Sequence, residues 1–297
     1  MPTSSIVVIH IMSTSYSGST WVNCLLGGHS ESFSIGELKN IQRMGRPFCD
    51  LHGDDCPLWT RFDHADHKNP FHQLHHLTNK RYLVVNNSRK FIHYQQEPGI
   101  ESRFIHLIRD GRAVAASRLR KLPKVTMGHV ARQWAHNVRR SQRLLRRCPG
   151  RKTELIYERI QADPEAELKR LCAFLEFDFE PGMLEYWNGV EHFLGGNIGT
   201  LTSLATKRGE TLQKRPTSVV RSKPELAYYE RTDPANFVAD QRWRRELSSS
   251  QLWTFRLLAG RVNQALGYPQ AKAAKMPARP NVGDGALERS GADSDRR

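Results

Sequence analysis

Residues 6–28 read IVVIHIMSTSYSGSTWVNCLLGG, and this stretch decides the fold. It opens with a β-branched run over residues 6–11, typical of a central parallel strand that is covered on both faces. A loop rich in Ser and Gly follows, and residues 20–28 are compatible with a helix that glycines end. Strand, Ser/Gly turn and helix together gather backbone N–H groups and a helix N-terminus around an anion. The sequence therefore predicts an anion-binding loop between its first strand and first helix.

The alternation of strands and helices continues along the chain. Further strands are predicted at residues 81–85, 104–108 and 153–157, and helices at residues 111–119, 163–175 and 247–266. This order predicts an α/β fold, in which a P-loop-NTPase-like central parallel sheet is flanked by helices. Ligands of such sheets bind beyond the carboxyl ends of the strands.

The composition is that of a globular protein. Hydrophobic residues make up 38% of the 297 residues and charged residues 25%. No apolar run reaches the roughly 20 residues that span a bilayer. The five cysteines are odd in number and too sparse for a secreted disulfide framework. We therefore expect a cytoplasmic protein.

The net charge of +15 is concentrated in one block. Residues 103–152 contain fifteen Lys or Arg residues and a single acid, Asp110. Such a block attracts polyanions: nucleic acid, acidic glycans, a phosphate-rich cofactor or an anionic membrane surface. The alternative is a solvated helix face that binds nothing.

Two regions interrupt the α/β pattern within a domain that we place at residues 1–269. Residues 40–80 are rich in Cys and His and predict an inserted lobe or lid, and residues 205–233 predict a polar loop. The tail, residues 270–297, has the composition of a disordered segment.

Possible zinc ligands in the inserted lobe are Cys49, His52, Cys56, His64 and His67. Their spacing is irregular for a zinc site, so we expect no metal.

The loop at residues 16–21, Tyr-Ser-Gly-Ser-Thr-Trp, resembles a known motif. In the sulfotransferases that use 3′-phosphoadenosine 5′-phosphosulfate (PAPS), the 5′-phosphosulfate loop reads basic residue-Ser-Gly-Thr-Thr-Trp. The resemblance implies that Ser17, Gly18, Ser19 and Thr20 hold the phosphosulfate and that Trp21 stacks on adenine. The alternative for Trp21 is a core aromatic. Tyr16 stands where the family often has a cation, so another residue must supply that charge.

A second motif lies at residues 104–117, which read FIHLIRDGRAVAAS. The apolar strand delivers Arg109 to its carboxyl end, and the following helix brings Ser117 back within two turns. A guanidinium binds phosphate through two charge-assisted hydrogen bonds, which a hydroxyl can complete. The segment is similar to the 3′-phosphate site of the same family, where an arginine precedes a serine by eight residues. The alternative is a surface ion pair between Arg109 and Asp110.

Weaker resemblances to the same family occur elsewhere in the chain. Residues 85–89, Val-Asn-Asn-Ser-Arg, resemble a strand end that carries lysine in bacterial members, with Arg89 in its place. Tyr157 falls in a Tyr-Glu strand end that can approach the nucleotide. Residues 195–197, Gly-Gly-Asn, resemble an element near the cofactor, and residues 241–268 resemble the family's closing Trp and helix.

The resemblance implies sulfuryl transfer from PAPS to an acceptor hydroxyl without a metal. Glu37 is the candidate base, because a Gly-Glu pair carries that role in the tyrosylprotein branch; its alternative is a structural carboxylate paired with Lys39 or Arg43. His93 is the second candidate base. Arg89 is the candidate cation, followed by Lys90.

The acceptor and the competing functions follow from the same features. We expect a hydroxylated acceptor such as a glycan, a glycolipid or a small molecule, which the basic surface suggests could be acidic. We expect no nucleic-acid partner, whereas a peripheral membrane contact is compatible with the charge. The alternatives are a P-loop nucleotide kinase, which the missing Gly-Lys-Ser/Thr disfavours, and a non-catalytic polyanion-binding protein.

Overall fold

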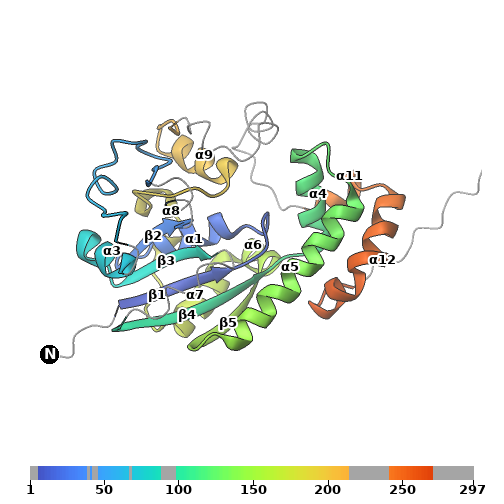
Figure 1. The fold of residues 1–297 in the computed structure, drawn as a ribbon, viewed down its shortest axis with the longest axis horizontal. Coiled ribbons are helices and arrows are strands. Elements are labelled where there is room, and N and C mark those ends of the chain that lie inside the picture. Colours follow the sequence, from blue (N-terminus) through green and yellow to red (C-terminus); the bar gives the residue numbers. More distant parts are fainter. Residues whose placement is uncertain are drawn as a thin grey trace, which may run out of the picture.

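The structure is a computed structural model that describes residues 6–38, 41, 46–66, 69–87, 98–213 and 241–269. Its centre is a five-stranded parallel sheet in the order β2-β3-β1-β4-β5. The strands are β1 (Ile6–Met12), β2 (Ser32–Gly36), β3 (Tyr82–Asn87), β4 (Ile100–Ile108) and β5 (Arg151–Ile156) (Figure 1). The predicted fold class, a parallel sheet flanked by helices, is confirmed.

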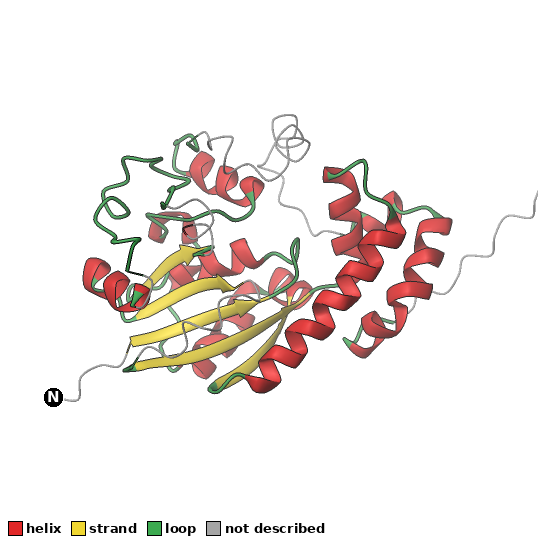
Figure 2. Ribbon diagram, viewed as in Figure 1, coloured by secondary structure: helices red, strands yellow, loops and turns green. Residues whose placement is uncertain are grey.

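Helices cover both faces of this sheet (Figure 2). They are α1 (Ser19–Gly27), α3 (Pro70–Thr78), α4 (Gly111–Lys121), α5 (Met127–Arg147), α6 (Tyr157–Ala162), α7 (Pro164–Leu175), α8 (Tyr186–Gly189), α9 (Ile198–Lys207), α11 (Trp243–Glu246) and α12 (Ser249–Ala265). On β4, Phe104 packs with Leu145 of α5, whereas Arg103 bonds the carbonyl of Leu175 at the end of α7. Because successive strand residues face opposite sides, α5 and α7 lie on opposite faces.

A second group of helices extends beyond the sheet. Helices α4, α5, α11 and α12 share a buried apolar cluster that includes Trp134, Trp243 and Phe255. In Figure 1 the long helix α5 runs from the sheet into this group. No helix among the described residues is long and apolar enough to cross a membrane.

Every predicted strand and helix is present, with shifts of a few residues at the ends, but several other elements were not predicted, among them β2 and α5. Strand β2 reads Ser-Phe-Ser-Ile-Gly, and all five of its residues are buried. Its two serines interrupt the apolar run that would have predicted a buried strand. The polar atom of Ser34 is accommodated because its hydroxyl donates to the Asn23 carbonyl at 3.0 Å. Helix α5 has an apolar stripe, with Val130, Trp134 and Val138 among its buried residues.

The described part of residues 40–80 packs into the main core. Cys49, Trp59 and Phe71 belong to the same buried cluster as the strands β1 and β3. The ring of Phe71 on α3 lies edge-on to that of His10 on β1, with 6.2 Å between the ring centroids. The segment is thus continuous with the sheet's packing. The predicted tail at 270–297 lies outside the described residues, as does most of the predicted loop at 205–233, beyond residue 213.

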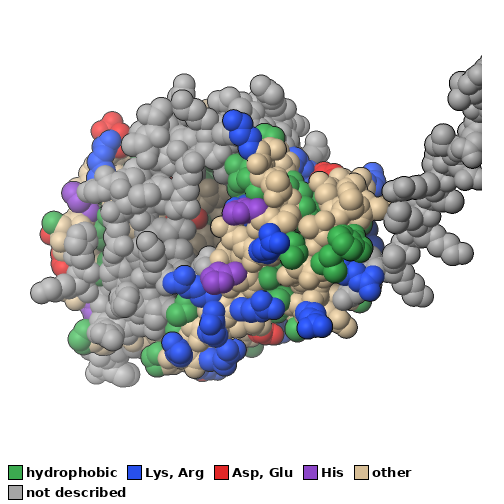
Figure 3. Space-filling view, turned by 45° about the vertical axis from the view of Figure 1, so that its right-hand side comes forward, with side chains coloured by type: hydrophobic (Ala, Val, Ile, Leu, Met, Phe, Trp, Pro, Cys, Tyr) green, Lys and Arg blue, Asp and Glu red, His purple; other side chains and the backbone are tan. Residues whose placement is uncertain are grey.

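The basic block divides into buried and exposed residues. Arg103, Arg109, Arg112 and Lys121 are buried. The exposed arginines of α5 are Arg132, Arg139, Arg140, Arg143, Arg146 and Arg147. Figure 3 shows Lys and Arg side chains gathered on the forward face with few acidic ones among them. Part of the block is therefore structural, and the rest is a solvated basic face.

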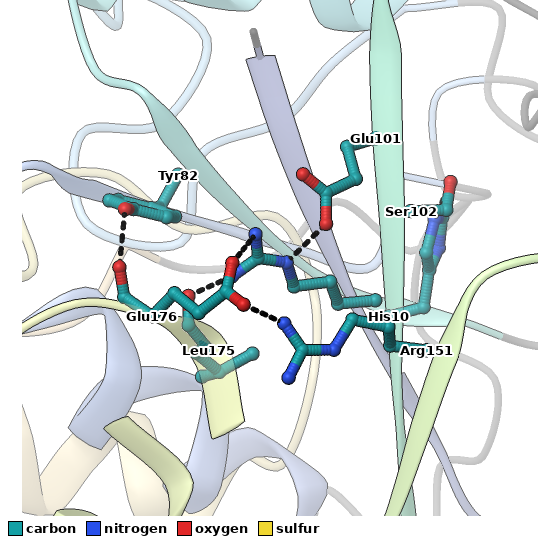
Figure 4. A network of polar contacts seen from close by, with 8 residues as sticks. His10, Tyr82, Glu101, Ser102, Arg151, Leu175 and Glu176 are labelled. Carbon is teal, nitrogen blue, oxygen red and sulfur yellow. Dashed lines mark hydrogen bonds and ion pairs between the residues drawn. The ribbon is translucent and has the colours of Figure 1, made fainter. Parts of the chain in front are cut away.

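A network of charged side chains lies toward the amino ends of β4 and β5, away from the strand ends where ligands bind (Figure 4). The buried guanidinium of Arg103 bonds Glu101 at 2.6 Å and Glu176 at 2.8 Å. Glu176 also pairs with Arg151. The hydrogen bond from Arg151 lowers the pKa of Glu176. This network joins α7 to the sheet, so these arginines serve packing.

Candidate active site

The loop between β1 and α1 turns sharply through two residues of positive φ. Tyr16 has φ 68° and Gly18 has φ 89°, and α1 begins directly afterwards at Ser19. The hydroxyls of Thr14 and Ser17 lie 2.7 Å apart and fix the loop from within. The N–H groups of a helix's first turn have no partner within the helix, so this end of α1 is suited to an anion.

Gly18 is required by space as well as by backbone conformation. A Cβ at this position would lie 2.6 Å from Cδ2 of Tyr157 and closer still to Cε2. Tyr157 begins α6, directly after β5, and its buried ring also lies edge-on to Trp21 with 6.0 Å between ring centroids. Tyr157 therefore lies against the predicted phosphosulfate loop.

Arg109 joins the second motif to this loop. It leaves the carboxyl end of β4, and its Nη1 donates to the carbonyl oxygen of Tyr16 at 2.9 Å. Its Cζ lies 4.1 Å from the centroid of the Tyr157 ring. The structure thus brings together the two motifs, which stand more than 90 positions apart in the sequence. Ser117 is buried two turns along α4.

Asp110 does not form a surface ion pair with Arg109, which was the alternative interpretation of this motif. It is buried and caps α4 by accepting from the backbone N–H of Arg112 at 2.9 Å. The Arg112 guanidinium also donates to both Asp110 oxygens, with Nη2 to Oδ2 at 2.7 Å. Asn263 of α12 completes this brace by bonding Asp110 and the Gly111 N–H. Asp110 therefore pairs with Arg112, whereas Arg109 contacts the loop through the Tyr16 carbonyl.

A tyrosine from the chain's last described segment supports the same corner. Glu158 accepts from the N–H of Asp110 at 3.1 Å and from the hydroxyl of Tyr268. Burial and this hydrogen bond raise the pKa of Tyr268, so the phenol stays protonated as a donor. The closing helix and its Gly-Tyr end therefore hold the second motif in place.

Glu37 follows the end of β2 and is half-buried. Its N–H donates to the carbonyl of Leu194 at 2.6 Å. The preceding Gly36 has φ 80°, and a Cβ there would lie 2.6 Å from the same carbonyl oxygen. Gly36 thus permits the turn that presents Glu37. Lys39 and Arg43, its alternative partners, lie outside the described residues.

The Gly-Gly-Asn element also reaches the loop. The N–H of Asn197 donates to Oγ1 of Thr20 at 2.9 Å. Gly196 has φ 94°, and a Cβ there would lie 2.8 Å from the same oxygen. A hydroxyl that accepts can still donate, so Thr20 retains a donor for a bound anion.

The remaining predicted residues divide into two groups. Trp21 is only 9% exposed and belongs to the main core, which matches the core alternative. Ser88, Arg89, Lys90 and His93 lie outside the described residues. Of their segment, Asn86 is described: its Oδ1 accepts from Asn23 of α1 at 3.3 Å.

One cation near the loop was missed by the sequence reasoning. Lys121, the last residue of α4, is buried, and its Nζ lies 4.9 Å from the centroid of the Tyr16 ring. It follows Ser117 by four residues, so both project from one face of the helix. That spacing, together with the missing cation at Tyr16, is the signal that could have identified it.

These observations define the class to which the protein belongs. The chain is a P-loop-like α/β protein that holds a Ser/Gly loop and a buried arginine together at the carboxyl edge of its sheet. Residues 101–181 match the profile of the sulfotransferase family. The matched segment contains Arg109, Ser117 and Tyr157, so the resemblance to sulfotransferases is confirmed where the second motif lies.

One solved structure extends the similarity of fold over most of the chain. The sulfotransferase domain of the Synechococcus PCC 7002 olefin synthase is similar with a TM-score of 0.53 and 18% identity, over 90% of this chain and 96% of that chain. A mouse sulfotransferase complexed with PAP is similar with a TM-score of 0.48 and 12% identity, over 89% of each chain.

Among curated proteins, a "Putative protein-tyrosine sulfotransferase" of Caenorhabditis briggsae is 32% identical over 91 residues. This similarity covers 29% of this chain and 32% of that protein. The matched part is thus about a third of the relative's length. The chain thus resembles the sulfotransferases in sequence over residues 101–181 and in fold over most of its length.

Proposed function

We propose that the protein transfers a sulfuryl group from PAPS to an acceptor hydroxyl. The observation that carries this proposal is the contact of Arg109 with Tyr16 and Tyr157, which brings an arginine against the anion-binding loop. One anion site would serve many phosphate ligands. Two anion sites in contact with each other suit a nucleotide with phosphates at two positions, and the 3′-phosphate distinguishes PAPS from ATP.

Within this proposal, each motif has a separate role. The residues Ser17 to Thr20 hold the 5′-phosphosulfate through the N–H groups of α1 and through hydroxyls. Arg109 binds the 3′-phosphate through its guanidinium, with Ser117 as a second donor. Tyr157 supports both, because it packs against Gly18 and under Arg109. Any adenine contact of Trp21 is restricted to its small exposed part.

The reaction itself is an in-line displacement at sulfur. The acceptor oxygen forms a bond to sulfur while the bond from sulfur to the bridging oxygen of PAPS breaks, and 3′-phosphoadenosine 5′-phosphate leaves. Such a transfer depends mainly on positioning and electrostatic stabilisation. Glu37 takes the proton of the acceptor hydroxyl, and His93 is the second candidate for this role.

A cation must stabilise the charge that develops on the bridging oxygen. Lys121 supports this part of the proposal, because its ammonium lies beside Tyr16, at the position where the family often has a basic residue. Arg89 remains a second proposed cation.

Calorimetry with 3′-phosphoadenosine 5′-phosphate and with ATP tests the cofactor. We expect clear preference for the former, because only it carries a 3′-phosphate. Labelled PAPS with a panel of sugars, phenols and lipid extracts then tests transfer. Equal affinity for the two nucleotides would contradict the proposal and favour a nucleotide kinase or a polyanion-binding protein.

A further inference from the structure

Four metal-binding side chains converge beside the sheet, outside the site described above. Cys49, His52 and Cys56 come from one loop, and His192 comes from a segment that follows α8. Their ligand atoms all lie within 4.8 Å of one another. The Sγ of Cys56 lies 3.2 Å from Nδ1 of His192 and 3.9 Å from Nδ1 of His52, and the Sγ of Cys49 lies 3.6 Å from the latter.

These distances match those between the ligands of a tetrahedral zinc ion. With Zn–S bonds of about 2.3 Å and Zn–N bonds of about 2.0 Å, neighbouring sulfur and nitrogen ligands are about 3.5 Å apart. The three sulfur–nitrogen distances of the cluster lie on both sides of this value. Two thiols and two imidazoles are also a set that structural zinc sites use.

The backbone around the cluster is arranged to present the two thiols. Cys49 and Gly53 exchange backbone hydrogen bonds of 3.2 and 2.8 Å, which form a tight turn with φ 74° at Gly53. The carbonyl of Cys56 accepts from the N–H and from the hydroxyl of Thr60, at 3.0 and 2.9 Å. These hydrogen bonds fix the backbone that carries the two thiols.

The other cysteines of the chain provide a contrast. Cys24, Cys148 and Cys172 are buried as well. Cys172 contacts the sulfur of Met183 at 3.8 Å, and Cys148 packs with Phe104 and Leu145, as small apolar side chains do. The grouping of two thiols with two imidazoles occurs once among the described residues.

We propose that Cys49, His52, Cys56 and His192 bind one structural zinc ion. All four ligands come from the protein, so the site is closed and holds no position for substrate. The expectation of no metal rested on irregular spacing within residues 40–80. The fourth ligand lies 136 positions after Cys56, which explains why the spacing was uninformative.

The zinc ion would fix the backbone that carries the candidate base. Next to the ligands, the N–H of Asp50 donates to the Phe193 carbonyl at 2.9 Å. Leu194 in turn bonds Ile35 and Glu37 on β2 and just after it, at 3.0 and 2.6 Å. The metal therefore joins the loop of Cys49, His52 and Cys56 to the segment that positions Glu37. Its role is structural, and it takes no part in the reaction.

Metal analysis of the purified full chain tests this proposal. We expect about one zinc per chain by elemental analysis under reducing conditions. Replacing zinc by Co²⁺ should give the visible bands of a tetrahedral site and a thiolate-to-cobalt charge-transfer band. The key variant is His52→Asn, because His52 is exposed and its loss leaves the core intact. Replacing a residue that only hydrogen-bonds a ligand weakens metal binding about 10–100-fold, and the loss of a ligand itself should weaken it more.

His64→Asn is the matched control, since His64 is an exposed histidine of the same loop that takes no part in the cluster. It should keep the zinc and the thermal stability of the parent. A chelator should lower the Tm of the parent and of His64→Asn, but change that of His52→Asn little. The proposal is overturned if the reduced chain binds no zinc, if Cys49 and Cys56 form a disulfide instead, or if both variants lose metal equally. None of these readouts depends on sulfotransferase activity.

Discussion

The guanidinium of Arg109 stacks on the ring of Tyr157, with 4.1 Å from Cζ to the ring centroid. A stacked guanidinium keeps its N–H edge directed outward, where it can bind a phosphate bidentately. Here part of that edge already holds the Tyr16 carbonyl. The arginine thus couples the position of the β1–α1 loop to the site proposed for the 3′-phosphate.

Arg109→Ala should weaken binding of 3′-phosphoadenosine 5′-phosphate by about 1.5–3 kcal/mol, the range for a hydrogen bond to a charged group. The same variant should bind ATP as weakly as the parent does. Calorimetry with both nucleotides measures the difference. Unchanged affinity would show that Arg109 serves the loop alone.

Gly18→Ala should destabilise the chain by more than the about 1–2 kcal/mol that a left-handed residue costs, because its Cβ also overlaps Tyr157. Gly267→Ala is the control. Gly267 has φ 88°, nearly that of Gly18, but no atom lies within 4 Å of its Cβ position. Urea unfolding of both variants separates the overlap from the backbone cost, and equal losses would refute the close packing.

Lys121→Met should lower the turnover of PAPS by about 10²–10³-fold, the usual cost of removing one preorganised charge or donor from a transition state. Nucleotide binding should change much less, because the charge on the bridging oxygen develops during the reaction. Lys124→Met, an exposed neighbour after α4, is the control and should retain activity. If turnover persists in Lys121→Met, the cation role moves to Arg89.

Glu37→Gln should abolish turnover and leave nucleotide binding intact, since the amide keeps the shape of the carboxylate but cannot take a proton. Glu31→Gln, at an exposed position before β2, should behave like the parent. Single-turnover assays with labelled PAPS measure the chemical step. Full activity in Glu37→Gln would transfer the base role to His93.

Glu176→Gln should lower the thermal stability at neutral pH, because it removes the partner of Arg103 and Arg151. The pKa of Glu176 is lowered in the folded chain, mainly by the hydrogen bond from Arg151. A lowered folded pKa stabilises the fold above the unfolded value, and this contribution is lost as the pH falls through the folded pKa. The difference in Tm between parent and variant should therefore shrink once the pH falls below the usual glutamate range. A difference that is constant with pH would contradict the ion pair.

The sequence predicted the parts of the fold that depend on local patterns. The buried run of β1, the glycine of the loop and the Asp163-Pro164 start of α7 each have a local physical cause, and each is found in the structure. Strand β2 was missed, because burial of its serines depends on partners such as Asn23 that local sequence does not show.

The candidate site was also predicted only where local sequence motifs indicate it. Arg109 and the loop were found from motifs, and the structure adds their contact. Lys121 and His192 were missed because their proposed roles depend on distant segments: on Tyr16 for Lys121, and on the loop of Cys49, His52 and Cys56 for His192. Sequence patterns identify residues that act with their neighbours in the chain. They do not reveal partners that only the tertiary fold provides.

The contacts of Leu194 have a consequence for the behaviour of the protein in solution. Strand β2 is an edge of the sheet, and Leu194 covers its carboxyl end through bridges to Gly36 and to Cys49. At the other edge, β5 exposes Arg151 and Lys152, and charged residues discourage pairing with another chain. The β2 edge is protected from such pairing by the segment of Leu194 and not by charged residues. Loss of that cover would leave strand hydrogen-bonding groups open, so chains that lose it should aggregate through β2 before the sheet itself unfolds.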